Sequence, residues 1–280
     1  MDTPESARPR ASVIISTYNA PEALEISLES FRHQREKNFE IIVADDGSTP
    51  ATAELIKRIA ANFPVPIKHV WHPDEGFRLS AIRNLAAAQA SSDYIIFIDG
   101  DCLVLKNFVS QHLRLREPGM FLSGRRTWLG RVITRRILAR RKPGSGYWPY
   151  WFMWALAGQV TGPFELLTAP AKLSFRYRLR GRYERAQTCN LAVWKADFMA
   201  IGGFDERYQA HGFEDSDFVV RLIRSGVPRK EGVFGSIVLH LNHPRPSRKP
   251  SPNAGMFAEL QASERVMAGH IYFAGDQSGA

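Results

Sequence analysis

Two aspartates, Asp99 and Asp101, directly follow the apolar run 94–98, and only Gly100 separates them. An uninterrupted apolar run is typical of a strand that is buried on both faces of a parallel sheet. Ligands of open α/β sheets bind just beyond the carboxyl ends of such strands. Aspartates there can simply form a turn, but this pair could also hold a hard divalent cation against phosphate oxygens.

A second acidic pair, Asp45 and Asp46, follows the run 40–44. A carboxylate at this place could accept an N–H group from a nucleobase, and nearby backbone amides could contact ribose or phosphate. Ser48 and Thr49 are good helix N-caps, which explains their presence but not two adjacent acids.

Three acids, Glu214, Asp215 and Asp217, open a predicted helix just after Gly212. The helix dipole favours acids in a first turn, but three of them exceed what a cap requires. A carboxylate here could act as a general base towards a hydroxyl group.

A histidine, His240, ends a predicted strand over residues 236–241. One imidazole beside aspartates would complete an oxygen and nitrogen shell that suits Mn²⁺ or Mg²⁺. His243 is the competing ligand, because it lies only three residues further on.

The elements that must position these residues alternate along the chain. The apolar patterns predict strands over residues 12–16, 40–44, 67–71, 94–98, 190–194 and 236–241, and helices over residues 21–34, 50–62, 79–90, 214–225 and 254–268. Strands separated by helices indicate βαβ units and a mostly parallel sheet.

The carboxyl ends of parallel strands meet at one edge of a sheet. We therefore expect the loop Thr17–Tyr18–Asn19 to lie beside both aspartate pairs. Arg78 and Arg83 enter or open a helix near the same edge, where cations could bind a diphosphate, although Arg83 taken alone fits a solvated helix face.

Composition is that of an ordinary soluble globular protein, with 44% hydrophobic and 23% charged residues in 280. The net charge of +9 is concentrated between residues 125 and 182, where thirteen lysines and arginines face one acid, Glu165. Cys102 and Cys189 do not make a disulfide framework and suggest reduced thiols in the cytosol. No signal peptide or bilayer-spanning run is expected.

Together these residues resemble glycosyltransferase family 2. The motifs that carry the resemblance are VIISTYN at 13–19, DDGS at 45–48, DGD at 99–101, NLAVW at 190–194, GGFD at 202–205 and GFED at 212–215. More narrowly, EGFR at 75–78, RN at 83–84, IDGDC at 98–102 and HLNHP at 240–244 resemble the N-terminal transferase module of bacterial chondroitin polymerases.

The resemblance implies a GT-A fold, a Rossmann-like and mostly parallel sheet flanked by helices, over residues 11–246. Residues 11–125 would be the nucleotide-binding half, residues 126–186 a basic aromatic insertion, and residues 187–246 the acceptor and catalytic half. A tail with a possible helix, residues 247–280, would follow.

The resemblance also implies an inverting transferase that uses a UDP-sugar and Mn²⁺ or Mg²⁺. Asp46 would recognise uracil with backbone contacts from Thr17 and Tyr18, and Asp99 would lie near the ribose. Asp101 and His240, with Asp99 as a further candidate, would hold the metal. Asp215 would be the catalytic base and Glu214 would help to hold the acceptor sugar. The remaining nucleotide-side candidates are Asn19, Arg78, Arg83 and Gly100.

One departure concerns the acceptor side. The related module has a Trp-Gly-Gly run before its Glu-Asp pair, whereas this chain has Ala210–His211–Gly212–Phe213. The acceptor wall therefore differs, while the acid pair is kept.

The basic aromatic insertion has no counterpart in the related module. Basic residues with tryptophan and tyrosine suit an anionic membrane surface, so we expect a cytoplasmic protein that binds peripherally at the inner face of the plasma membrane. It would meet a glycan or lipid-linked glycan acceptor there, in cell-surface polysaccharide or lipopolysaccharide synthesis. A lid over the donor, or a binding face for a phosphorylated sugar, is the alternative role.

Three other functions are open to this sequence. A sugar-nucleotide nucleotidyltransferase would share the fold, but it should carry a Gly-rich basic loop where this chain has residues 17–20. A nucleic-acid-binding protein would explain the net charge, yet the charge is confined to one segment and no nucleic-acid motif is visible. An inactive scaffold would not need Asp101 and Asp215. We therefore expect no nucleic-acid partner.

Overall fold

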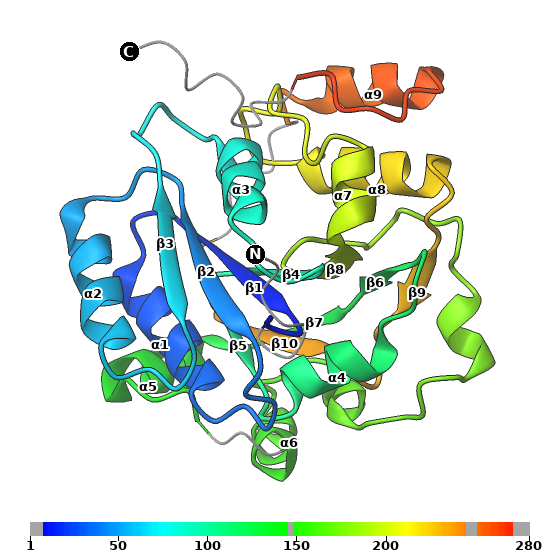
Figure 1. The fold of residues 1–280 in the computed structure, drawn as a ribbon. Helices are drawn as coiled ribbons and strands as arrows, with labels where there is room; N and C mark the ends of the chain where they lie inside the picture. Colours follow the sequence, from blue (N-terminus) through cyan, green and yellow to red (C-terminus); the bar gives the residue numbers. More distant parts are fainter. Residues whose placement is uncertain (1–7, 145–147, 245–250, 271–280) are drawn as a thin grey trace.

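The larger sheet of the protein has seven strands in the order β3-β2-β1-β4-β8-β6-β9 (Figure 1). The computed structural model describes residues 8–144, 148–244 and 251–270. The strands are β1 (Ser12–Thr17), β2 (Glu40–Asp45), β3 (Ile67–Trp71), β4 (Tyr94–Asp99), β6 (Phe121–Ser123), β8 (Asn190–Trp194) and β9 (Arg229–Glu231). Strands β3, β2, β1 and β4 are parallel, and β8 runs antiparallel between β4 and β6. The predicted mostly parallel sheet is confirmed.

Helices cover both faces of this sheet (Figure 1). Successive residues of a strand point to opposite faces. Val13 and Ile15 accordingly pack in one apolar core with α1, α2 and α4, and Ile14 in the opposite core with α3, α7 and α8. These helices are α1 (Pro21–Phe31), α2 (Pro50–Ala60), α3 (Leu79–Ala88), α4 (Phe108–Leu115), α7 (Lys195–Ala200) and α8 (Glu214–Arg224).

A smaller, three-stranded sheet has the order β5-β10-β7. Its strands are β5 (Cys102–Val104), β7 (Arg125–Trp128) and β10 (Ile237–His240). Strand β10 was predicted from the sequence, whereas its two short partners were not. The predicted insertion, residues 126–186, thus begins inside β7, and its first residues belong to this sheet.

The rest of the insertion touches both sheets, because residues 131–166 pack on the smaller sheet and residues 174–177 contact β9 of the larger one. It forms α5 (Arg131–Arg140), α6 (Trp148–Leu156) and two 3-10 helices, η2 (Pro163–Leu166) and η3 (Ser174–Tyr177). Ile133, Ile137 and Trp151 form an apolar core with Leu103 and Leu239 of the smaller sheet. Residues 145–147 lie outside the described part of the chain.

The predicted closing helix is shorter than expected. Helix α9 covers Ala254–Ala262 and ends there because Ser263 adopts an extended conformation. The irregular segment predicted around residues 244–252 falls mostly on residues 245–250, outside the described residues, as do residues 271–280 of the tail. Among the helices of the described residues, none has the length and apolar character that a bilayer crossing requires.

Candidate functional site

One cavity of about 790 Å³ lies at the carboxyl ends of the central strands. Its wall contains every predicted site residue except Asn19 and Arg78: Thr17, Tyr18, Asp46, Arg83, Asp99, Gly100, Asp101, Glu214, Asp215 and His240. Residues from both halves of the chain therefore meet in a single space, as expected from the parallel strand order.

The two adjacent aspartates of the DDGS motif have different surroundings. Asp46 lines the cavity, where its carboxylate lies 2.6 Å from Nε2 of His72 and accepts the Arg78 amide at 3.1 Å. Asp45 is fully buried instead and binds His69 and the Ser48 amide, each at 2.9 Å. Asp46 is thus the member of the pair that can meet a ligand.

Gly47 lets the chain turn directly after these aspartates. Its φ is +85°, and a Cβ atom there would lie 2.5 Å from the backbone of Asp74. Only glycine fits both conditions, because side chains disfavour positive φ.

Two residues predicted to bind the nucleotide, Asn19 and Arg78, do not line the cavity. The Asn19 side chain accepts the Thr49 amide at 2.9 Å, and the Asn19 amide donates to the Ser48 hydroxyl at 2.8 Å. The Arg78 guanidinium pairs with Glu75, three residues earlier, and only the Arg78 amide reaches Asp46. Both side chains thus contact neighbouring loop residues, and neither residue lines the cavity.

Arg83 is the cation at the centre of the site. It is 1% exposed, and its guanidinium donates to the Ser16 hydroxyl at 3.0 Å, to Asp99 at 3.1 Å and to Asp215 at 3.4 Å. The solvated helix face considered for Arg83 is therefore wrong. Burial raises the pKa of Asp99, although the charge of Arg83 opposes that shift.

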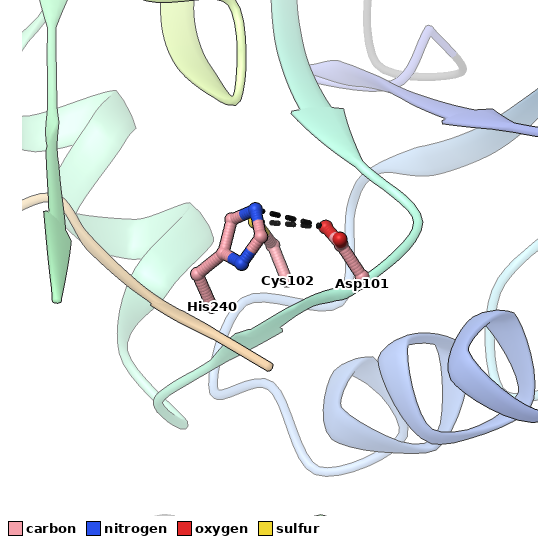
Figure 2. Close-up of side chains that lie close together, drawn as sticks. All are labelled: Asp101, Cys102 and His240. Atoms are coloured by element: carbon pink, nitrogen blue, oxygen red, sulfur yellow. Dashed lines mark hydrogen bonds and ion pairs between the residues drawn. The ribbon is translucent and has the colours of Figure 1, made fainter. Parts of the chain in front are cut away.

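A group with metal-ligand chemistry lies beside this network and consists of Asp101, Cys102 and His240 (Figure 2). The Asp101 carboxylate is 3.4 Å from Nε2 of His240. Nδ1 of His240 lies 2.8 Å from the Leu241 carbonyl oxygen, so a proton on Nδ1 leaves the Nε2 lone pair facing Asp101. Such a backbone partner is typical of histidines that bind metals.

The donor set fits Mn²⁺ or Mg²⁺ better than a softer metal. Asp101 supplies oxygen and His240 nitrogen, whereas burial holds the pKa of the Cys102 thiol well above its usual range and keeps it neutral. Nε2 of His243 is 3.3 Å from Asp101, so the structure brings both candidate histidines to this carboxylate. Asp99, also predicted as a ligand, lies outside this group because its carboxylate faces Arg83.

The turn between the two aspartates depends on Gly100. Its amide donates to the Ser16 carbonyl oxygen at 2.7 Å, and a Cβ atom would approach that oxygen to 2.9 Å. This contact fixes the exit of β4 against β1, which sets the positions of Asp99 and Asp101.

Helix α8 brings the acid pair to the opposite wall of the cavity. The Asp215 carboxylate accepts the hydroxyl of Thr188 and, at 3.1 Å, its amide. Glu214 accepts the Gly212 amide at 2.8 Å. Burial, together with the charge of Asp215, raises the pKa of Glu214 to about 7. Glu214 therefore keeps its proton up to a higher pH than an ordinary glutamate does.

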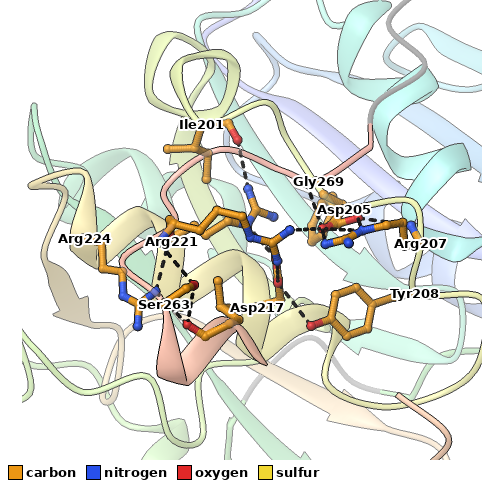
Figure 3. A network of polar contacts seen from close by, with 12 residues as sticks. Ile201, Asp205, Arg207, Tyr208, Asp217, Arg221, Arg224, Ser263 and Gly269 are labelled. Carbon is orange, nitrogen blue, oxygen red and sulfur yellow. Dashed lines mark hydrogen bonds and ion pairs between the residues drawn. The ribbon is translucent and has the colours of Figure 1, made fainter. Parts of the chain in front are cut away.

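A buried polar network holds α8 in place (Figure 3). Asp217 binds Arg221 at 2.5 Å and accepts the Tyr208 hydroxyl at 3.1 Å. Arg265, from the segment after α9, reaches both Asp217 and Asp205. The third acid at the start of α8, Asp217, thus belongs to the contacts that anchor the helix.

Sequence reasoning missed several cavity residues: Arg126, Trp128, Gln187 and Thr188. His72, the partner of Asp46, was missed as well. The sequence carried one signal for Thr188, because it is a polar residue just before the strand predicted at 190–194. His211, the residue that departs from the related module, lines the cavity and contacts the Phe77 ring at a centroid distance of 6.2 Å.

Two family models match the chain. The model of glycosyl transferase family 2 matches residues 12–145. A model described as the N-terminal domain of galactosyltransferase matches residues 170–243. The two matches meet across the cavity, because the first contains Asp46 and Asp101 and the second contains Asp215 and His240.

Curated relatives are similar over most of this chain. A chondroitin synthase of Pasteurella multocida (strain Pm70) is 26% identical over 265 residues, which is 89% of this chain but 26% of that protein. A validoxylamine A glucosyltransferase of Streptomyces hygroscopicus subsp. jinggangensis is 26% identical over 239 residues, 79% of this chain and 53% of that protein. The chain thus spans about a quarter to a half of these relatives.

Solved structures share the fold. GalNAc-T7 with UDP, GalNAc and Mn²⁺ superposes with a TM-score of 0.61 at 17% identity, over 91% of this chain and 48% of that one. The mannosyltransferase PcManGT of Pyrobaculum calidifontis, in complex with GDP-Man and Mn²⁺, gives a TM-score of 0.57 at 18% identity, over 86% of this chain and 59% of that one. The predicted GT-A fold is confirmed. The chain therefore carries a glycosyl transferase family 2 domain over residues 12–145, followed by the second matched region at residues 170–243.

Proposed function

We propose that this protein is an inverting glycosyltransferase that uses a divalent cation and moves a sugar from a UDP-sugar to a hydroxyl group of a glycan. The observation that carries the proposal is the position of Asp215. Its carboxylate shares one cavity with Asp101, His240 and Asp46 and is oriented by Thr188 and Arg83. Solved relatives of the fold hold Mn²⁺ together with UDP or GDP-Man, which supports this class of donor and metal.

Each side chain has a defined task in this reaction. Asp46 accepts a hydrogen bond from the N–H group of uracil, and the backbone of Thr17 and Tyr18 lies beside the base. Asp99 lies near the ribose of the bound donor, and Arg83 is the cation near its diphosphate. Asp101 and His240 hold the cation, with His243 within reach. When bound, a divalent cation offsets the charge of the departing diphosphate.

Asp215 then takes the proton of an acceptor hydroxyl. The resulting oxygen attacks the anomeric carbon from the side opposite the diphosphate. One C–O bond forms while the bond to the diphosphate breaks, so the configuration inverts in a single step and UDP leaves. Glu214, whose pKa is raised to about 7, holds an acceptor hydroxyl from the neighbouring position. His211 in the same wall contributes to the choice of acceptor.

The test is UDP release from a panel of UDP-sugars with Mn²⁺ or Mg²⁺, followed by stereochemical analysis of the glycoside. Asp215→Asn should lower turnover by roughly 10²–10⁴-fold while UDP still binds, because a general base contributes that much. Asp93→Asn, which removes an exposed acid outside the cavity, is the matched control. Failure of the wild type to bind UDP with either metal would refute the proposal, as would retention of configuration.

The proposed acceptor is a glycan or lipid-linked glycan of cell-surface polysaccharide or lipopolysaccharide, met at the inner face of the plasma membrane. The surface of α5, α6 and η2 supports this. Val132, Met153, Leu156 and Phe164 are 58%, 66%, 71% and 64% exposed. Exposed arginines of α5 accompany them: Arg131, Arg135, Arg136 and Arg140. Each cation near an anionic bilayer contributes about 1 kcal/mol.

Flotation with vesicles tests this membrane surface. Wild-type protein should float with vesicles that contain anionic lipid and should float less at high salt. The double variant Met153→Ser and Leu156→Ser should bind more weakly, and so should Arg135→Gln. Equal recovery with neutral and anionic vesicles would show that the electrostatic attraction is absent.

A further inference from the structure

A second, smaller cavity of about 260 Å³ opens beside the main one. Arg126, Trp128, Gln187 and Cys189 line both spaces, so the smaller cavity is a side pocket of the main site. Its remaining wall residues are Gly124, Arg125, Glu165 and Arg185. Typical ligand pockets measure roughly 300–1,000 Å³, so the side pocket fits one substituent or a single sugar unit and not a whole nucleotide sugar.

The side pocket carries an excess of positive charge. Three arginines, Arg125, Arg126 and Arg185, line it together with a single acid, Glu165. Within the described residues, none of the three arginine side chains has a carboxylate within ion-pair distance, Glu165 included. The Arg126 guanidinium lies over the Trp128 ring instead, 4.3 Å from its centroid. Clustered arginines normally acquire anionic partners, because their mutual repulsion is otherwise uncompensated.

One further observation points to a missing partner. Nε of Arg125 is buried and donates no hydrogen bond in the structure, although a buried donor of a charged group is costly to leave unpaired. Arg125 belongs to the wall of the side pocket, and an anion there would supply an acceptor for this donor.

The side pocket also adjoins the reaction centre. Gln187 and Cys189 flank Thr188, whose amide and hydroxyl donate to Asp215. On the other side, Trp128 packs against His240, with ring centroids 4.4 Å apart. Residues of the side pocket wall are therefore next to both a partner of the proposed base and the proposed metal ligand.

We propose that the side pocket is a subsite for an anionic group, a carboxylate or a phosphate, carried by one of the sugar substrates. Guanidinium forks suit both groups, because their paired oxygens accept two parallel N–H donors. The group comes from the donor if its sugar is a uronic acid, and from the acceptor if that glycan is phosphorylated or acidic. The inference rests on the proposed function, since it names the chemistry of a substrate of the same site.

Sulfate titration by calorimetry tests the subsite directly, with UDP and Mg²⁺ saturating so that the diphosphate site is filled. Wild-type protein should bind sulfate, and Arg125→Gln and Arg185→Gln should each weaken this binding about tenfold or more. Arg178→Gln removes the same charge from an exposed position outside the pocket and should leave sulfate binding unchanged. UDP affinity, measured in separate titrations without sulfate, reports whether each variant is folded. Sulfate binding that is absent, or equal in all four proteins, would overturn the subsite.

Paired sugars then identify the source of the anion. If UDP-glucuronate competes with sulfate and UDP-glucose does not, the donor carries the acidic group. If glucose 6-phosphate competes in the presence of UDP and glucose does not, the acceptor carries it. If sulfate binds but neither acidic sugar competes, the substrate assignment is wrong. If UDP with metal does not bind at all, the transferase proposal fails, while sulfate binding to the free protein still decides the subsite.

Discussion

The guanidinium of Arg83 lies 3.4 Å from the carboxylate of Asp215, although 132 residues separate them in the chain. The same guanidinium donates to Asp99 at 3.1 Å and is 1% exposed. Arg83 therefore connects the end of β4 with the start of α8. We infer that it holds the nucleotide side and the catalytic side in a fixed relation.

Arg83→Lys tests this connection. Lysine keeps the charge but cannot reach Ser16, Asp99 and Asp215 at once, because it lacks the planar fork. We expect kcat/KM to fall by about tenfold or more while the cooperative melting transition is retained. Arg58→Lys is the matched control, since Arg58 is 61% exposed in its pair with Glu25. Wild-type kinetics for Arg83→Lys would contradict the role.

The two histidines beside Asp101 should contribute unequally to metal binding. The His240 side chain is 4% exposed and its Nδ1 faces the Leu241 carbonyl, whereas the His243 side chain is 44% exposed. We expect His240→Ala to weaken Mn²⁺ binding by roughly 10–100-fold and His243→Ala to weaken it less. Titration of Mn²⁺ by electron paramagnetic resonance measures both. Equal losses would place both imidazoles on the metal.

Removal of metal by a chelator should abolish UDP-sugar turnover, and Mn²⁺ or Mg²⁺ should restore it. The restored rate should depend on Asp101, so Asp101→Asn should need a much higher Mn²⁺ concentration than the wild type. Activity that persists in excess chelator would refute the proposed metal dependence.

Thr188 should act by orienting Asp215. Thr188→Val removes the hydroxyl donor to the carboxylate and leaves the amide donor at 3.1 Å in place. We expect kcat to fall by about tenfold with KM for the UDP-sugar unchanged, since the base is misplaced while the donor site is intact. Thr168→Val, at an exposed position, is the control. A rise in KM alone would instead assign Thr188 to donor binding.

The raised pKa of Glu214 predicts how stability depends on pH. Its pKa is about 7 in the folded protein against an ordinary 4.5, because burial and Asp215 disfavour the charged form. The folded state therefore holds the proton more tightly, and stability falls as pH rises from 4.5 to about 7. Glu214→Gln should reduce this slope, by roughly 1–3 kcal/mol over the window. Denaturant unfolding across pH 4.5–8 measures it, and an unchanged slope would contradict the assignment.

Asp205 should affect the pH dependence of stability in the opposite sense to Glu214. Burial alone would raise its pKa, but Arg207 and the Gly269 amide lower it to about 2, against an ordinary 3.8 (Figure 3). The unfolded state therefore binds the proton more tightly, and stability is lost as pH falls through 3.8 towards 2. Asp205→Asn should destabilise the protein at pH 7 and flatten its acid transition. Identical acid unfolding of both proteins would show that Asp205 contributes nothing.

Strands β1, β2 and β4 were predictable because each is a short apolar run followed by polar residues. That local pattern also gave the position of Asp46, Asp101 and Thr17 at one sheet edge. The three-residue strands β5, β6 and β9 were missed, because so short a run carries no periodicity. Strand β7 was missed because Arg125 and Arg126 appear in the sequence as part of a basic segment, while its pairing with β10 joins residues more than a hundred positions apart.

The sequence by itself determined which residue types stand at the ends of the strands, since apolar runs, glycines and acid pairs are local features. Only the tertiary structure decided the partners of those residues. In the folded chain Arg83 is buried and contacts two carboxylates, Asp46 contacts His72, and Thr188 donates hydrogen bonds to Asp215. Three arginines also come together around the side pocket. These outcomes depend on contacts between distant segments. Burial and the competition among nearby charges fix such contacts once the chain has packed, and spacing along the sequence does not encode them.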